Sequence, residues 1–178
     1  ECMSEDPFLT GRIAVGFIRG VQAGGVGTTV KHFVANDSEF ERTTISSEVD
    51  ERTLREVSMR PFQMAVAEGG AWGVMASYNR VNGTYAAENR WMLDTVLRGE
   101  WSFDGLVVSD WFGTRSTGPS VTAGLDLEMP GPPHWYGERL VEAVEAGEVP
   151  ELVLDRAVRR LLLLAERTRA FEEPHLRE

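Results

Sequence analysis

The sequence is poor in cysteine and contains no long apolar run. Cys2 is its single cysteine, so no disulfide can form within the chain, and we expect a cytoplasmic rather than a secreted location. No stretch reaches the roughly 18 apolar residues of a membrane-spanning helix, which predicts no membrane partner. The chain starts at Glu1 without a basic and apolar leader, and it has no initiator methionine at position 1. We therefore expect a piece cut from a longer protein.

Positive charge is also scarce. The chain has 28 acidic and 18 basic residues among 178, which gives a formal net charge of -10. This balance disfavours binding to nucleic acid or to an anionic membrane, and we expect a neutral or polar partner. A content of 42% hydrophobic and 26% charged residues excludes a disordered chain and is typical of a globular domain.

Lysine is the scarcest basic residue, because Lys31 is the only lysine and the other basic residues are all arginine. Lys31 lies in the strand-like run at residues 28–33 and is followed by His32. Lysine offers a compact, rotatable ammonium group, whereas the guanidinium of arginine is a rigid planar fork. A site that needs the ammonium cannot accept the exchange, so Lys31 is a candidate site residue.

Strand-like segments alternate with helical ones. Strands are predicted at residues 28–35, 71–79 and 105–110, with a shorter fourth at 123–130. Leu106, Val107 and Val108 form a continuous apolar run, which is typical of a parallel strand covered on both faces. Each strand ends in polar residues. The segments at 28–35 and 105–110 therefore lead from a core directly to candidate site residues.

Helices are predicted between and after these strands. Asp50 is a plausible helix cap and Pro61 suits a first turn. The helix near residues 90–98 places one apolar side inward. The residues on the predicted apolar stripes are Ile13, Phe17 and Val21 in the first helix, Met92, Leu93, Val96 and Leu97 in the third, and Leu154, Val158, Leu161, Leu162 and Ala165 in the last.

This alternation predicts an α/β fold with a parallel sheet over the whole range 1–178. A complete (β/α)8 barrel needs at least roughly 200 residues and eight strands. Four strands could instead form about four βα units of a partial TIM-type barrel, or an open doubly wound sheet. Function gathers beyond the carboxyl ends of the strands in both architectures.

The polar strand ends carry a carboxylate, cations and aromatic rings. Asp110 and Trp111 follow the third strand, and Tyr78 follows the second. A carboxylate with cationic partners and a flat aromatic wall suits a sugar ring, so the pattern favours glycoside hydrolysis. Lys31 and Arg42 would keep Asp110 ionised, as a nucleophile must be. This chemistry needs no metal or organic cofactor, and we expect none.

Four runs occur in a characteristic order: residues 4–11 (SEDPFLTG), 30–36 (VKHFVAN), 75–79 (MASYN) and 108–111 (VSDW). Together they closely resemble the N-terminal barrel of glycoside hydrolase family 3, and most of all its bacterial β-glucosidases. The resemblance implies retaining hydrolysis of terminal non-reducing β-D-glucosyl residues of glucosides or β-linked oligosaccharides through a covalent glycosyl-Asp110 intermediate. It further implies sugar binding by Lys31, His32, Arg42 and Tyr78, with Trp111 packed beside them and Met75 nearby.

Family members usually carry a longer barrel domain, with a sugar-binding aspartate and arginines, and a following domain that supplies the acid/base glutamate. No glutamate of this sequence matches that position. We therefore expect the C-terminal half of the barrel domain, with little or no hydrolysis by this chain alone.

Other interpretations remain open. A Schiff-base aldolase would use Lys31 as its nucleophile, and a non-catalytic carbohydrate-binding fragment would differ from an enzyme only in turnover. A phosphoacceptor domain needs a lysine after the aspartate strand, whereas Lys31 precedes it. Structural roles are also plausible for the candidates: strand-end capping by Asp110, core packing by Met75, and pairing of Arg42 with an adjacent glutamate. Asp126 and Glu128 are expected to be structural, and the oligomeric state is left open.

Overall fold

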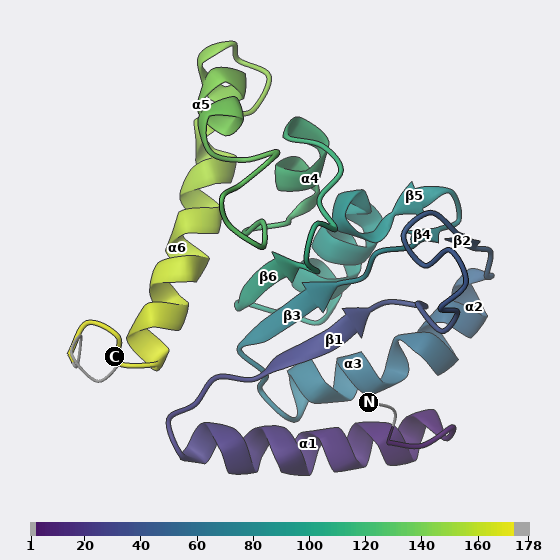
Figure 1. Cartoon of the computed structure of the whole chain (residues 1–178). Helices are drawn as coiled ribbons and strands as arrows, with labels where there is room; N and C mark the ends of the chain where they lie inside the picture. Colours follow the sequence, from purple (N-terminus) through teal and green to yellow (C-terminus); the bar gives the residue numbers. More distant parts are fainter. Residues whose placement is uncertain (1–2, 173–178) are drawn as a thin grey trace.

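The computed structural model describes residues 3–172, and its centre is a parallel sheet (Figure 1). In this part of the chain, β1 (Thr29–Phe33), β3 (Gly73–Ala76) and β6 (Leu106–Ser109) pair in the order β1-β3-β6. Val74 in the central strand lies opposite both Val30 and Val107. All of β6 is buried, which agrees with the apolar run predicted for a strand covered on both faces.

Helices cover the sheet and the ends of its strands. Figure 1 shows α1 (Pro7–Ala23) and α3 (Arg60–Ala67) side by side near β1, and α6 (Glu151–Arg167) on the β6 side. The remaining helical elements are α2 (Glu51–Thr53), the π-helical η1 (Leu54–Ser58) and η3 (Trp91–Glu100), the 3-10 turn η2 (Ala86–Glu88), α4 (Gly118–Ala123) and α5 (Glu138–Glu145). A small unpredicted sheet joins β2 (Ser46–Ser47), β4 (Arg80–Val81) and β5 (Thr84–Tyr85).

Local signals in the sequence explain where several helices begin and end. The Asp50 side chain caps α2 by accepting the Thr53 N–H at 3.0 Å, as predicted. Asp6 caps α1 in the same way through the Leu9 N–H at 2.8 Å. Pro61 occupies the first turn of α3, and Gly24 ends α1. These residues meet the needs of helix ends, where backbone groups lack partners within the helix.

The predicted fourth strand is wrong in its extent. Ala123 belongs to α4, and the following segment makes one parallel bridge to the sheet, between Leu127 and Val108. The Asp126 carboxylate accepts the Val107 N–H at 2.8 Å, so a side chain takes the place of a strand carbonyl. The sheet therefore continues beyond β6 as a single bridge, and the βα alternation is that of part of a (β/α)8 barrel.

The predicted stripe of α1 is not its buried face. Ile13 and Phe17 are 43% and 62% exposed, whereas the buried residues of Pro7–Ala23 are Gly11, Val15 and Ile18. The absence of a side chain at Gly11 lets α1 approach α3 closely, because an added Cβ would lie 2.5 Å from the Met64 sulfur. Close helix contact therefore selects the face with the small residue.

The stripe predicted for α6 is also largely exposed. Val158, Leu161 and Leu162 are 45%, 42% and 51% exposed, and Ala157 is the one buried residue within Glu151–Arg167. The helix contacts β6 and α4, and its partly buried Val153 and Leu154 also pack against the core. Periodicity identified the helix correctly, and Leu154 of the predicted stripe packs against the core, but the middle of the stripe is exposed.

The core lies between the sheet and η3. Met92, Leu93, Val96 and Leu97 are fully buried there, which confirms the apolar side predicted for this helix. At the end of β1, the Phe33 ring packs edge-on against the rings of Phe62 and Trp101, with centroids 5.2 and 5.9 Å apart. Across residues 3–172, no helix combines the length and apolar character needed to cross a membrane.

Candidate active site

Asp110 is the centre of the polar edge at which the parallel strands end. It directly follows β6, and its side chain is 10% exposed. One carboxylate oxygen, Oδ1, accepts the Trp111 N–H at 2.7 Å. The other, Oδ2, lies 3.3 Å from Nε2 of His32, which belongs to β1. The structure thus brings together a carboxylate and an imidazole that are far apart in the sequence.

Tyr78 completes the immediate surroundings of this carboxylate. Its side chain, which follows β3, hydrogen-bonds to Asp110. Burial, followed by this hydrogen bond and the negative charge of Asp110, raises the pKa of Tyr78 above its ordinary value. The phenol therefore stays protonated at neutral pH and serves as a donor to Asp110.

Arg42 lies over the ring of Tyr78. The centre of its guanidinium is 5.2 Å from the centroid of the Tyr78 ring, a distance at which a cation is attracted to the ring. Its Nη1 also pairs with Oε2 of Glu39 at 3.0 Å, where both side chains are largely exposed. Arg42 therefore pairs with a neighbouring glutamate, as the structural interpretation expects, and lies over the ring of Tyr78.

The remaining candidates line the same edge at different depths. Lys31 is exposed on β1, and the peptide bond between Lys31 and His32 is cis. Met75 is half-buried in β3, opposite Val108 of β6. Trp111 is 56% exposed directly beside Asp110. An aromatic ring next to a recessed carboxylate gives this edge a flat apolar wall.

Buried polar side chains fix the backbone under the cluster. Asn79 is fully buried, and its Nδ2 lies within hydrogen-bond distance of the carbonyl oxygens of Ala35 and Arg80, at 3.1 and 3.0 Å. The Ser77 hydroxyl donates to the Val34 carbonyl at 3.2 Å. The ends of β1 and β3 are thereby tied together independently of their strand pairing.

Two further carboxylates near β6 have structural partners, as expected. Glu128 is buried and accepts the backbone N–H groups of residues 134–136 at 2.7 to 3.1 Å. Asp126 accepts Arg98 at 2.6 Å and Arg160 at 2.9 Å. Burial raises the pKa of Asp126, and the charges of the two arginines act in the opposite direction. Both carboxylates therefore serve as anchors for the chain around β6.

The sequence did not single out Arg115. From the segment after β6, its Nη2 donates to the Thr43 carbonyl at 3.0 Å, and its guanidinium lies over the Tyr85 ring at 5.1 Å. An arginine in a polar loop carries no periodic or motif signal. Its place five positions after Asp110 is the one feature that could have drawn attention to it.

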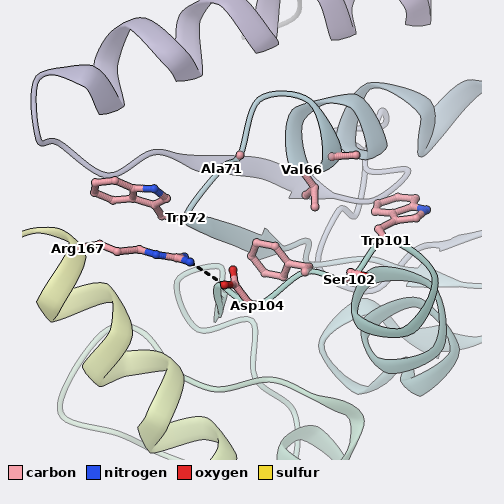
Figure 2. A pocket seen from close by; sticks show the side chains of 10 residues that line it. Val66, Ala71, Trp72, Trp101, Ser102, Asp104 and Arg167 are labelled. Carbon is pink, nitrogen blue, oxygen red and sulfur yellow. Dashed lines mark hydrogen bonds and ion pairs between the residues drawn. The ribbon is translucent and has the colours of Figure 1, made fainter.

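The opposite end of the sheet carries a hollow of a different kind. It has a volume of about 300 Å³ and lies where the chain enters β3 and β6 (Figure 2). Trp72, Trp101 and Phe103 line it, and the ion pair between Arg167 and Asp104, 2.7 Å long, spans its rim. The described residues 3–172 contain no group of three or more His, Cys, Asp or Glu side chains placed to hold a metal ion.

Comparison with known proteins gives consistent matches. Residues 1–164 match the family model described as "Glycosyl hydrolase family 3 N terminal domain". A beta-glucosidase of Rhizobium radiobacter is 58% identical over 179 residues, which cover 100% of this chain and 22% of that protein. Beta-glucosidase B of Emericella nidulans is 45% identical, and the match covers 100% of this chain and 21% of that protein.

Solved structures match as well. The structure of beta-glucosidase 3B from Thermotoga neapolitana in complex with glucose is 41% identical, with a TM-score of 0.90 over 96% of this chain and 25% of that chain. Beta-glucosidase from Kluyveromyces marxianus, also in complex with glucose, is 38% identical with a TM-score of 0.92 over 97% of this chain and 21% of that chain. The chain thus spans about a fifth to a quarter of the length of these proteins.

Proposed function

The chain belongs to glycosyl hydrolase family 3, and from this we propose that it supplies the nucleophile and part of the sugar site of a retaining β-glucosidase-like hydrolase. The substrate is a glucoside or β-linked oligosaccharide with a terminal non-reducing β-D-glucosyl residue. The relatives named beta-glucosidase support this substrate class.

One observation carries the assignment of the nucleophile to Asp110. Its carboxylate is recessed, yet it is surrounded by the Trp111 N–H, the His32 imidazole and the Tyr78 hydroxyl. Hydrogen bonds to a carboxylate fix the rotation of its two oxygens. Asp110 therefore offers an oriented oxygen at the carboxyl edge of the sheet, where barrel enzymes carry their active sites.

The reaction proceeds by double displacement. An oxygen of Asp110 attacks the anomeric carbon while the bond to the leaving oxygen breaks, and a carboxylic acid protonates that oxygen. Water then attacks the glycosyl-Asp110 ester and gives its proton to the same acid/base group, which releases glucose and restores both carboxyl groups. Lys31, His32 and Arg42 offer donors to the sugar hydroxyls, and the exposed face of Trp111 can cover its C–H surface.

The proton donor belongs, in this proposal, to a part of the enzyme outside residues 1–178. Glu128 accepts three consecutive backbone N–H groups, and Asp126 accepts two arginines. These engagements support the expectation that neither acid protonates a leaving group. We therefore expect the chain alone to hydrolyse an aryl β-glucoside poorly or not at all.

An activated substrate tests the nucleophile without needing the proton donor. Dinitrophenyl 2-deoxy-2-fluoro-β-D-glucoside should add one fluoroglucosyl group to the chain, and peptide mass spectrometry should locate it on Asp110. Asp110→Asn should abolish the mass gain. Asp104→Asn is the matched control, because Asp104 lies at the other end of β6 and its side chain is 66% exposed.

Different outcomes identify the alternatives. Saturable glucose binding without any labelling of Asp110 would indicate a carbohydrate-binding chain. Borohydride trapping of a carbonyl substrate on Lys31 would indicate a Schiff-base aldolase. Robust turnover of an aryl β-glucoside by the pure chain, lost in Asp110→Asn, would show that the proton donor lies within residues 1–178.

A further inference from the structure

Arg115 connects two segments that both contribute to the candidate site. It follows Asp110 and Trp111 in the chain, and its Nη2 donates to the carbonyl of Thr43, which lies 72 residues earlier. Thr43 is the neighbour of Arg42, whose guanidinium lies over Tyr78. The hydrogen bond therefore joins the segment that carries the carboxylate to the loop that carries a sugar-binding candidate.

The guanidinium of Arg115 lies over the aromatic ring of Tyr85, and other contacts hold this ring in place. Two arginines lie over the ring of Tyr85 in β5, with Arg115 at 5.1 Å and Arg80 at 4.6 Å from the ring centroid. Arg80 also donates to the Tyr85 hydroxyl at 3.1 Å, and the backbone N–H of Arg80 donates to the Ile45 carbonyl at 2.8 Å. Through Arg80, the Tyr85 ring is thus linked to Ile45, at the end of the loop (residues 36–45) that Arg115 contacts.

Arg115 also lies close enough to Tyr78 for its charge to act there. Its positive charge lowers the pKa of Tyr78, as that of Arg42 does, against the larger effect of burial. Nε of Arg115 is buried and has no hydrogen-bond partner among the described residues. The described contacts of this side chain are therefore those to Thr43 and Tyr85, while its charge also acts on the Tyr78 phenol.

We propose that Arg115 is a positioning residue, which holds the loop at residues 36–45 against the segment after β6 and so sets the place of Arg42 relative to Asp110. This role rests on the proposed glycoside chemistry, and it concerns binding of the glucoside rather than formation of the bond to Asp110. Arg115 donates to the backbone carbonyl of Thr43.

Two substitutions separate the contacts of Arg115. Arg115→Met removes the donor and the charge but keeps an apolar chain over Tyr85. Arg115→Lys keeps a charge and one donor that can reach Thr43, but loses the planar group that stacks on the ring. Arg80→Met is the matched control, because it removes an arginine from the same ring but keeps the strand pairing of residues 80 and 85 and the backbone bond from residue 80 to Ile45. The Arg80 side chain makes no bond to residues 36–45 among the described contacts.

The kinetics of labelling by the fluoroglucoside distinguish binding from bond formation. The concentration for half-maximal labelling rate should rise roughly three- to tenfold in Arg115→Met, while the limiting rate stays within about twofold, as expected for loss of one hydrogen bond that acts on binding. Arg115→Lys should recover part of the loss, and Arg80→Met should match the parent. A lower limiting rate with unchanged half-saturation, or no change in either constant, would overturn the proposal.

Hydrogen exchange provides a measurement that does not depend on the reaction. The N–H groups of Thr44 and Ile45 donate to the Glu41 carbonyl, both at 2.8 Å. Their exchange should speed up in Arg115→Met and stay slow in Arg80→Met, and unchanged exchange in Arg115→Met contradicts the positioning role. Absence of labelling in the parent chain would count against the proposed function, and the exchange result would then still decide the role of Arg115.

Discussion

At its amino end the parallel sheet meets the hollow of Figure 2, which both aromatic and charged side chains line, whereas at its carboxyl end it meets Asp110, His32 and Tyr78. Both ends carry an aspartate next to β6. Asp104 at the amino end is 66% exposed and pairs with Arg167 at the surface, whereas the side chain of Asp110 is 10% exposed and has protein donors around it. The same residue type thus serves as a solvated surface charge at one end and as an oriented, recessed group at the other.

The largest expected contrast is in reactivity. Asp110→Asn should lower the rate of labelling by the fluoroglucoside by at least roughly a thousandfold, because an amide is a poor nucleophile. Asp104→Asn should label at the parent rate. Comparable losses of labelling rate in the two variants would show that Asp110 is no more reactive toward the fluoroglucoside than Asp104.

The next effect concerns stability at the edge of β6. Asp126→Ala should lower the free energy of unfolding by about 3–5 kcal/mol, because Arg98 is left buried without its carboxylate and the Val107 N–H loses its acceptor. Urea unfolding of the variant and the parent measures this difference. Asp126→Asn, which keeps an acceptor of the same shape, should lose less, and equal losses would assign the effect to packing alone.

A smaller effect should appear in the titration of Tyr78. Burial is the first cause of its raised pKa, and the hydrogen bond and negative charge of Asp110 follow. Asp110→Asn should therefore lower the pKa of Tyr78 toward its ordinary value without reaching it. The difference in ultraviolet absorbance between chains with and without Tyr78→Phe follows this phenol as pH rises. A pKa unaffected by Asp110→Asn would show that the carboxylate does not act on Tyr78.

The smallest effect is expected at the rim of the hollow. Arg167→Met should change the free energy of unfolding by less than about 1 kcal/mol, because an exposed ion pair gains little over its hydrated ions. Urea unfolding again provides the measurement. A loss of unfolding free energy as large as that of Asp126→Ala would show that the Arg167–Asp104 pair stabilises the fold as much as the buried Asp126 carboxylate does.

Much of the site could be predicted because its signals are local. The apolar run of Leu106 to Val108 identifies a buried parallel strand, and the carboxyl end of such a strand is a fixed place in the fold. His32 and Tyr78 follow or end strands of the same sheet, so a common edge brings them to Asp110. The helix cap at Asp50 and the first-turn position of Pro61 were predicted for the same reason, because each depends on a few adjacent residues.

The features that escaped prediction depend on contacts between distant residues. Periodicity gives an apolar stripe but not its neighbour, and α1 instead packs through Gly11 on Met64. The fourth strand is shortened to a bridge because the Asp126 side chain replaces a backbone acceptor. Arg115 contacts a carbonyl 72 residues away, and no local pattern records such a bond.

The exposed apolar faces of α1 and α6 have a calorimetric consequence. Phe17 and Leu162 already contact water in the folded chain, at 62% and 51% exposure, so unfolding hydrates less new apolar surface. The heat-capacity change of unfolding should therefore fall below the ~12–15 cal/mol/K per residue of typical domains. A smaller heat-capacity change flattens the dependence of stability on temperature, so the chain should lose stability gradually on both heating and cooling.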